Sequence, residues 1–539
     1  MSDLPKIAVF SGPTATISNS PPLITSNKAR AEHGFDLLPG RFDDLRPQRL
    51  AAPATLYVEA LSAHPLEADA AYLYAPPDGW LDDAGEFHTI DPGSGTPVHR
   101  IRLDPNDGLY PLPFMGRQAD ESPWDGPGVD RTSDHNRTRQ TFYPDSSRLY
   151  EEIDRLGIGT HGRANLLSSR ATFEHFRPAP SGGYRSAPQL EVPGEDYFAY
   201  SPFHLRTEPA LSALARSTNM VQRVLDTGDY IGAQWLEGSS TTEETMYWLG
   251  LVIDTSLPLV GHLAQRAHQL ASADGDRNII DGVEYLTSGV ALDDDGRDRV
   301  GAVVLVDEVL FSARDAAKTD ARPGNFVATG GHGGVVATMG GAGPPKLTYL
   351  STRLHTYQSQ VHLGRMPVEV ASVRGAIGNA ASTVTAVKDE TGDLLTDAMP
   401  RVQIVKFGRY HGPDDELEII ERTKANLVDG ALGGFVAEGM SPYGLMNLVQ
   451  DDALRTATFC GHPTVFVGRG NTGGMASDLG PLVVSGDNLT ANKARMLLMA
   501  CLLRFGALPP AKDPARPSRD EYRATRVAIS AIQDIFATH

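Results

Sequence analysis

The sequence has little cysteine and no long apolar run, and these absences exclude several classes of protein. Only Cys460 and Cys501 occur among 539 residues, too few for a disulfide-bonded scaffold or a four-cysteine zinc site. No segment approaches the roughly 20 consecutive apolar residues of a membrane-spanning helix, because the run from Met246 to Ile253 ends at Asp254. The first residues show no basic segment before a long apolar one, so no secretory signal is expected. We therefore expect a cytoplasmic protein.

Positive charge is also in deficit. The chain has 48 Lys and Arg against 67 Asp and Glu, a net charge of −19. This balance argues against nucleic acid and against an anionic membrane surface as partners. Hydrophobic residues make up 41% and charged residues 21%, which is typical of a globular protein, and the length predicts roughly three domains.

The texture of the chain divides it into three parts, and the predicted fold class is α/β. Residues 1–34 and 191–395 form a larger N-terminal parallel-sheet domain, and residues 396–539 a smaller C-terminal α/β domain. Residues 35–190 are rich in Pro, Gly and Asp and are predicted to be a β-rich insertion. Its short strands are predicted at Thr55–Glu59, Ala71–Tyr74 and Val98–Leu103.

Continuous apolar strands joined by helices indicate a parallel sheet that is covered on both faces. The predicted strands are Ile7–Phe10, Tyr230–Leu236, Leu257–Val260, Val300–Val306, Val402–Lys406, Gly434–Val436 and Thr464–Val467. The predicted helices are Glu243–Leu251, Arg277–Leu286 and residues 415–428, 442–451 and 491–504.

Hydroxyl groups or a lysine follow three of these strands, where an open parallel sheet binds its ligands. The first segment contains Thr14 and Thr16, the second is Glu237-Gly-Ser-Ser-Thr-Thr-Glu-Glu-Thr245, and the third contains Lys318. A hydroxyl nucleophile needs a base, and a lysine can serve when burial lowers its pKa toward neutrality.

Each segment also has a purely structural interpretation. Thr241-x-x-Glu244 fits a helix capping box, Asp315 and Lys318 fit a solvated i,i+3 pair on a helix, and the threonines of the first segment fit a turn. No metal site is expected, because the histidines of the insertion lack HxH or i,i+4 spacing. These histidines are His88, His99, His135, His161 and His175.

In their order, these segments resemble the bacterial-type L-asparaginase/glutaminase family. Ala15-Thr16-Ile17-Ser18 is similar to the end of the family's nucleophile loop, and Glu237–Thr245 is similar to its His-Gly-Thr-Asp-Thr-Met-Glu-Glu-Thr motif. Further matches are Ser272-Ala-Asp274-Gly275 with Asn278, Arg314-Asp-Ala-Ala-Lys318-Thr319, Arg353-Leu-His355-Thr356, Leu489-Thr-Ala-Asn-Lys-Ala-Arg495 and Ile532-Gln-Asp-Ile-Phe536. The resemblance covers residues 5–30 and about 195–539, and it does not cover 35–190.

The resemblance implies an asparaginase-like fold and an amidohydrolase that needs no cofactor. Thr16 would be the nucleophile, favoured over Thr14 because Ile-Ser follows it, and Ser239, Ser240 and Lys318 would complete the catalytic group. The implied substrate-binding residues are Thr14, Gly238, Ser272, Asp274 and Glu438. The last of these would reach a neighbouring subunit's site, so a homodimer or homotetramer is expected.

Two departures from the family bear on the substrate. Ser240 stands where the family has an aspartate that receives the substrate's α-ammonium group, and the tyrosine usual after the nucleophile is missing. The loss of the aspartate favours a neutral carboxamide, lactam or cyclic imide or ureide. A true asparaginase with a rebuilt pocket, or a binding protein that has lost the chemistry, are the alternatives.

The choice of nucleophile can be tested directly. Thr16→Ala is expected to abolish turnover without unfolding the protein, because a residue in a loop after a strand contributes little to the core, whereas Thr14→Ala is expected to be milder. Activity and thermal unfolding of both variants check this. An inactive Thr14→Ala beside an active Thr16→Ala would show that the loop is aligned wrongly.

Overall fold

The structure is a computed structural model of the whole chain. It describes residues 4–12, 17–18, 54–58, 78–82, 86–103, 141–142, 150, 153–154, 165–176, 210–266, 273–319, 326–328, 334–340, 343–408, 410, 414–470, 474 and 479–539. The chain divides into two compact units. The first is Met1–Pro209, Leu236–Gly238 and Leu263–Val283, and the second is Ala210–Trp235, Ser239–His262 and Glu284–His539.

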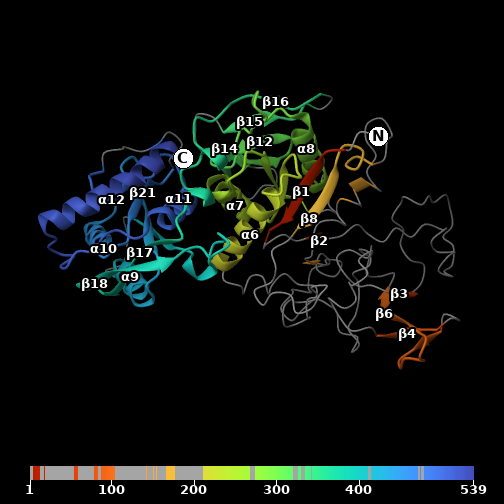
Figure 1. Ribbon diagram of the computed structural model, residues 1–539, viewed down its shortest axis with the longest axis horizontal. Coiled ribbons are helices and arrows are strands. Elements are labelled where there is room, and N and C mark those ends of the chain that lie inside the picture. The colour runs from red at the N-terminus through yellow and green to blue at the C-terminus, as the bar shows by residue number, and fades with distance from the viewer. Residues whose placement is uncertain are drawn as a thin grey trace. The chain divides into compact units, whose positions relative to one another are not determined.

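The first unit is built on the buried strand β1 (Lys6–Ser11). It pairs in parallel with β8 (Thr172–Phe176), and the two strands lie side by side in Figure 1. The rings of Phe10 and Phe176 stack with centroids 5.4 Å apart. The prediction of a strand at Ile7–Phe10 is confirmed.

The insertion contains short strands in its described parts. A four-stranded sheet has the order β3-β6-β4-β5, made of β3 (Ala54–Val58), β4 (Gly79–Leu81), β5 (Phe87–His88) and β6 (Thr96–Leu103), all antiparallel. A second pair joins β2 (Ile17–Ser18) to β7 (Thr141–Phe142). The strands predicted near 55–59 and 98–103 are present, and Ala71–Tyr74 lies outside the described residues.

The second unit contains a sheet with the strand order β16-β15-β12-β11-β10-β9. Its strands are β9 (Ala233–Leu236), β10 (Leu259–His262), β11 (Val303–Val306), β12 (Val309–Ser312), β15 (Val335–Thr338) and β16 (Lys346–Leu347). Strands β10 and β11 are parallel, whereas β11–β12, β12–β15 and β15–β16 are antiparallel. The α/β prediction is confirmed, with an antiparallel extension that the apolar runs did not indicate.

The switch to antiparallel pairing begins at a tight hairpin. Asp307 and Glu308 join β11 to β12 and both have positive φ, 49° and 65°. A two-residue turn with φ positive at both positions matches the twist of antiparallel strands. The sheet can therefore continue without a crossover helix at this edge.

Three helices lie along this part of the chain, two of them near the predicted Glu243–Leu251 and Arg277–Leu286 and one that was not predicted. The unpredicted helix is α6 (Ala210–Leu225), and the other two are α7 (Ser239–Val252) and α8 (Gly275–Ser288), whose residues up to Val283 belong to the first unit. Trp248 of α7 is fully buried, and its indole N–H donates to Thr218 Oγ1 of α6 at 2.8 Å. Two antiparallel pairs follow, β13 (Ala316–Lys318) with β14 (Phe326–Ala328), and β17 (Glu369–Ala376) with β18 (Asn379–Ala386). Short 3-10 turns lie at Thr356–Gln358, Leu363–Arg365 and Thr396–Ala398.

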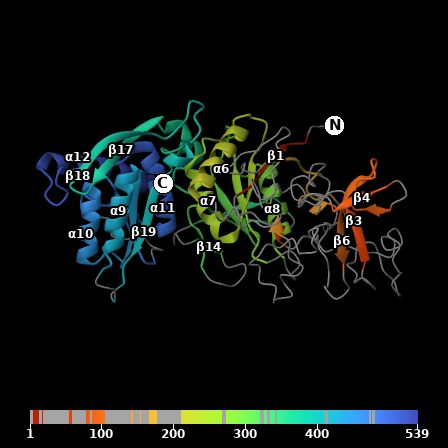
Figure 2. The ribbon, with the colours of Figure 1, turned by 90° about the horizontal axis from the view of Figure 1, so that it is seen from below.

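A second parallel sheet in this unit matches the predicted C-terminal α/β texture. Its order is β19-β20-β21-β22, with β19 (Arg401–Lys406), β20 (Gly433–Gly439), β21 (Thr464–Gly468) and β22 (Val484–Ser485). The helices are α9 (Leu417–Asp429), α10 (Leu448–Phe459), α11 (Ala491–Phe505) and α12 (Arg519–Thr538). Figure 2 shows α9 and α10 on one side of β19 and α11 on the other.

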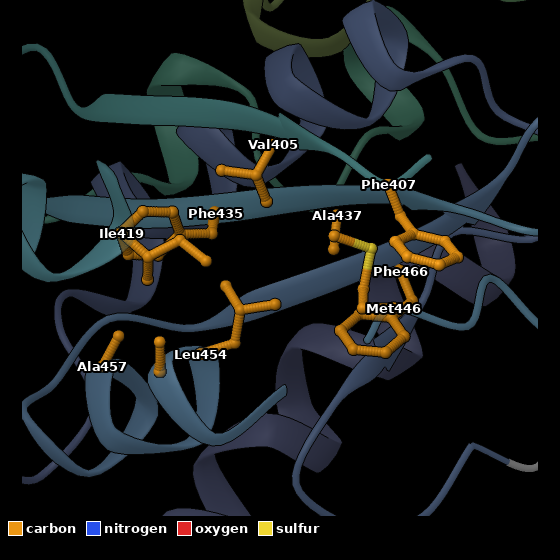
Figure 3. Packing of buried hydrophobic residues seen from close by; sticks show 10 residues of the cluster. Val405, Phe407, Ile419, Phe435, Ala437, Met446, Leu454, Ala457 and Phe466 are labelled. Carbon is orange, nitrogen blue, oxygen red and sulfur yellow. The ribbon is translucent and has the colours of Figure 1, made fainter. Parts of the chain in front are cut away.

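Alternation along β20 explains this layering. Phe435 and Ala437 point into a buried cluster with residues of α9 and α10, among them Ile419 and Leu454 (Figure 3). Gly434 comes directly before Phe435 and faces the opposite side, where a Cβ would approach Leu498 of α11 to 3.0 Å. Successive residues of a strand face opposite sides of the sheet, so β20 packs against helices on both faces of the sheet.

The helix predicted at 442–451 begins later, at Leu448. Asn447 caps it, because its side chain accepts a hydrogen bond from the Gln450 amide at 2.8 Å. Asn is among the preferred residues at this position. The preceding residues contain a cis Ser441–Pro442 bond and a bridge between Met440 and Leu445, so this part of the prediction was wrong. Among the described helices, none combines the length and apolarity that a membrane span requires.

Buried neutral histidine predicts how the unfolding free energy depends on pH. Burial lowers the pKa of His262 in β10 from 6.5 to about 3. The unfolded chain therefore binds a proton below pH 6.5 that the folded chain does not, and stability is lost as the pH falls from 6.5 toward 3. We expect His262→Met to reduce the loss between pH 7 and pH 4.5 by roughly 2–3 kcal/mol. Urea unfolding of both proteins at the two pH values measures this, and an identical loss in both would contradict it.

Candidate active site

The segment that carries Thr14 and Thr16 begins at the end of β1. Ser11 is buried, and the Gly12 amide donates to the Leu236 carbonyl at 2.8 Å. This bond places the exit of β1 beside the exit of β9, within the first unit. Both threonines lie outside the described residues, and Ile17–Ser18 immediately after them form β2.

The second segment forms the start of α7. Gly238 precedes the helix, Ser239 is its first residue and is half-buried, and Ser240 is its second residue. Amides in the first turn of a helix have no partner within it, so they can stabilise negative charge. The capping-box prediction was wrong, because α7 begins before Thr241 and the Glu244 carboxylate pairs with Arg495 at 2.6 Å.

The third segment is joined to α7 by a hydrogen bond. Lys318 is the last residue of β13, and its backbone N–H donates to Glu243 Oε2 at 2.9 Å. Its ammonium lies 5.8 Å from the centroid of the Phe326 ring on β14. Burial raises the pKa of Glu243, although this bond and the nearby Lys493 act in the opposite sense. The elements that carry Ser239 and Lys318 are thus held together.

The solvated helix pair predicted for Asp315 and Lys318 was wrong. Asp315 lies in a turn and is 9% exposed, and it forms an ion pair with the buried Arg314 at 3.0 Å. The Arg314 guanidinium also donates to Asn488 Oδ1 at 2.8 Å and to the His539 carbonyl at 2.7 Å. These contacts anchor the turn that leads into β13.

Lys493 is a residue that the sequence patterns did not single out. Its side chain is 2% exposed, and its ammonium donates to the carbonyls of Ala313, at 2.6 Å, and Glu243. Burial lowers its pKa from 10.5 to about 8. The signal in the sequence was its place in Leu489–Arg495, a segment of the resemblance to which no role was attached.

Asp274 supports the loop after β10, within the first unit. Its buried carboxylate accepts hydrogen bonds from the Gln265 amide at 3.0 Å and from the Arg266 amide at 2.8 Å. Asn278 adds a bond from its side-chain amide to the Leu263 carbonyl at 2.8 Å. Through these contacts Asp274 stabilises the conformation of the loop. Its binding of substrate stays a prediction, and Ser272 lies outside the described residues.

Glu438 lies next to the end of β20 and is half-buried. Its Oε1 is 3.3 Å from Lys406 Nζ on the neighbouring strand β19. The side chain is therefore at the carboxyl end of the second sheet, as the sequence predicted. The residues after it expose several large apolar side chains, namely Met440, Tyr443, Leu445, Leu448 and Val449.

One group in the insertion has ligand atoms of the kinds that metal ions bind. Side-chain atoms of Asp82, Glu86 and His88 lie within 4.8 Å of one another. The Asp82 carboxylate already accepts the Glu86 amide at 2.9 Å and contacts His88 Nε2 at 2.7 Å. These hydrogen bonds join the end of β4 to β5, and they explain why the three side chains lie close together.

The support that Asp274 gives to its loop can be measured. Asp274→Asn removes the charge from the acceptor of the Gln265 and Arg266 amides, and hydrogen bonds to charged groups contribute about 1.5–3 kcal/mol. We expect these two amides to exchange hydrogen about tenfold faster or more. Asp295→Asn, at an exposed carboxylate elsewhere, is the control. If the exchange rates of the two amides are unchanged in the Asp274 variant, the carboxylate does not stabilise this loop.

No family model matches the chain. Three curated relatives are similar over part of it. They are a glutaminase-asparaginase of Acinetobacter glutaminasificans (33% identical over 113 residues, covering 21% of this chain and 31% of the relative), a glutaminase-asparaginase of Pseudomonas aeruginosa (29% over 205 residues, 36% and 53%), and an L-asparaginase of Bacillus licheniformis (36% over 101 residues, 19% and 30%). The chain thus spans between about a third and about half of the length of these relatives.

Among solved structures, a probable cytoplasmic L-asparaginase from Campylobacter jejuni is similar with a TM-score of 0.46 and 19% identity, covering 68% of this chain and 86% of the other. Two of the sequence relatives are named glutaminase-asparaginase and the third L-asparaginase, and these names agree with the resemblance drawn from the motifs. The sequence matches therefore support the asparaginase-like family for this chain, at low identity and over part of the relatives' length.

Proposed function

We propose that the chain is an amidohydrolase that cleaves a C–N amide bond through Thr16 and an acyl-enzyme. The observation that carries the proposal is the bond between Glu243 and Lys318, which joins α7 and β13 at 2.9 Å. It ties the helix that starts at Ser239 to the strand that ends at Lys318. The curated relatives, described as glutaminase-asparaginases and an L-asparaginase, point to the same chemistry.

In the proposed reaction, Thr16 Oγ attacks the amide carbonyl carbon and its proton passes through Ser239 to Lys318. Ser240 positions these groups. Backbone amides of the nucleophile loop and of the start of α7 stabilise the oxyanion, where the loss of one donor typically costs 10²–10³ in rate. The C–N bond breaks as the amine receives the proton, and water then hydrolyses the threonine ester to release the acid.

Ser240 directs the substrate preference toward neutral amides. An α-ammonium group in a partly buried pocket needs a fixed carboxylate to offset its lost hydration. A serine can accept a hydrogen bond but supplies no charge, and charge-assisted bonds are roughly twice as strong as neutral ones. Losing that partner costs on the order of 2–5 kcal/mol. A carboxamide, lactam or cyclic imide or ureide avoids this cost.

The first rival is a true asparaginase or glutaminase with an altered amino-acid pocket. The names of the relatives favour it, and Glu438 of a neighbouring subunit would replace the missing carboxylate. The second rival is a binding protein without catalysis. Hydroxyls at positions 16 and 239 and the lysine at 318 argue against that second rival, because binding alone requires none of them.

We also propose that the protein acts as a homodimer or homotetramer. Leu448 is 86% exposed, and it lies with other exposed apolar side chains in the segment that follows Glu438. Burial of such side chains between subunits would offset their exposure. The acidic composition disfavours nucleic acid and an anionic membrane surface as partners. The resemblance implies a small-molecule amide substrate and no cofactor, and we propose a cytoplasmic location.

The substrate class can be tested with matched compounds. We expect kcat/KM for succinamate, which lacks the α-amine, to exceed that for asparagine, because Ser240 provides no negative charge to pair with the α-ammonium group. Release of ammonia is followed for both, and ring opening for 2-pyrrolidone, succinimide and hydantoin. Thr16→Ala is the control for background hydrolysis. A clear preference for asparagine would favour the plain asparaginase, and no turnover of any compound would favour the binding protein.

A further inference from the structure

Lys493 occupies a position that is unfavourable for a lysine. It lies in the first turn of α11, after the cap residue Thr490, where the helix dipole repels positive charge. It is also among the largest fully buried side chains of the described residues. Lysine is almost never fully buried unless it is paired, so its partners identify what it does.

The partners of the Lys493 ammonium are backbone carbonyls of two different elements. One is Ala313, in the turn between β12 and β13, at 2.6 Å. The other is Glu243, in α7. The ammonium also lies 5.5 Å from the centroid of the Tyr247 ring, one helical turn further along α7. A single side chain from α11 therefore joins α7 to the turn before β13.

The Glu243 carboxylate completes this connection at the other end of the same segment. It accepts the Lys318 N–H at 2.9 Å, whereas the Glu243 carbonyl accepts the Lys493 ammonium. The segment 313–318 is thus joined to α7 directly at Lys318 and through the Lys493 ammonium at Ala313. We call Lys493, Glu243, Ala313 and the Lys318 amide the α7–β13 clamp.

Charged groups surround the ammonium. Glu243, Glu244 and Asp315 raise its pKa and Arg314 lowers it, and burial is the largest influence, so that the pKa is about 8. The ammonium is therefore still mostly protonated at pH 7. A protonated lysine provides charge-assisted hydrogen bonds, which are shorter and stronger than neutral ones.

We propose that Lys493 is a positioning residue for the amidase reaction, and that its two carbonyl contacts fix the start of α7, with Ser239 and Ser240, against the strand that carries Lys318. The inference rests on the proposed function. Lys493 does not act on the substrate itself. It sets the distance over which the proton passes between the serine hydroxyl and the catalytic lysine.

The central test is Lys493→Met, which keeps an unbranched side chain and removes the ammonium. We expect kcat to fall about 100-fold, because a misplacement of about 1 Å costs that much, while KM changes less than about threefold. Both are measured on succinimide, or on the compound of the panel above that the wild type converts fastest.

Two control variants separate positioning from loss of stability. Ile529→Ala removes a buried side chain of α12 and lowers the melting temperature without touching the α7–β13 clamp. Lys424→Met removes an exposed lysine that pairs with Glu421. Both are expected to keep kcat near that of the wild type. If Ile529→Ala loses kcat in proportion to its melting temperature as Lys493→Met does, the role is structural and the proposal is overturned.

A double-mutant cycle tests whether the clamp works as a unit. Glu243→Leu removes the acceptor of the Lys318 amide, and it is expected to lower kcat about as much as Lys493→Met. The double variant is expected to lose little more than either single one, since residues that act together are not additive. Additive losses would show that the two contacts act separately and would contradict the clamp.

Hydrogen exchange provides a readout that does not depend on the reaction. In Lys493→Met, amides of 243–247 and 314–318 are expected to exchange about tenfold faster, and those of the β17–β18 hairpin to stay unchanged. If the wild type is inactive on every compound but Lys493→Met shows this exchange pattern, the proposed function is refuted while the structural role of the clamp is supported. Active protein with unchanged exchange and unchanged kcat in Lys493→Met would refute the inference alone.

Discussion

Backbone groups in the loops that leave a sheet lose their strand partners, and this constraint shapes both units. A buried amide or carbonyl without a partner costs about as much as a lost hydrogen bond. In the first unit Asp274 accepts the amides of the loop after β10. In the second unit Glu243 and Lys493 satisfy the amide of Lys318 and the carbonyl of Ala313. Charged side chains thus take the place of the missing strands.

The two charges of the α7–β13 clamp depend on each other. Burial raises the pKa of Glu243 and lowers that of Lys493, so each side chain alone is pushed toward its neutral form. Their mutual attraction acts against this, and so does the backbone hydrogen bond that the Glu243 carboxylate accepts from Lys318. Removal of either charge would leave the other buried with less compensation, which is more costly than removing both.

The strands were predictable from the sequence because each is a run of buried apolar residues. Val303–Val306 is fully buried, and Phe435–Ala437 packs helices on both faces. Antiparallel pairing at β12 was not predictable, since a hairpin of Asp307 and Glu308 lacks the usual glycine or asparagine signal. Periodicity thus indicates what is buried but not which strand lies beside which.

Candidate site residues were predictable where they belong to a sequence motif. They were missed where their role depends on a contact with a residue far away in the sequence. Glu244 fits a capping box locally, but Arg495, far along the chain, takes its carboxylate. Lys493 has the appearance of any lysine near a helix start, because nothing in its neighbours shows that Ala313 will lie within reach. The positions of Ser239 and Lys318 followed from motif order, whereas what holds them together required the structure.

Keeping the Lys493 ammonium buried is energetically costly. A pKa lowered from 10.5 to about 8 means that the folded protein disfavours the charged form. At neutral pH this corresponds to about 3 kcal/mol of lost stability, a large share of the 5–15 kcal/mol that typically holds a domain together. A methionine or leucine would avoid that cost, although it would leave the carbonyls of Glu243 and Ala313 without this donor. A protein selected for stability alone would therefore gain little from this lysine, whereas one that must hold α7 against β13 at a fixed separation gains two charge-assisted hydrogen bonds from a single side chain.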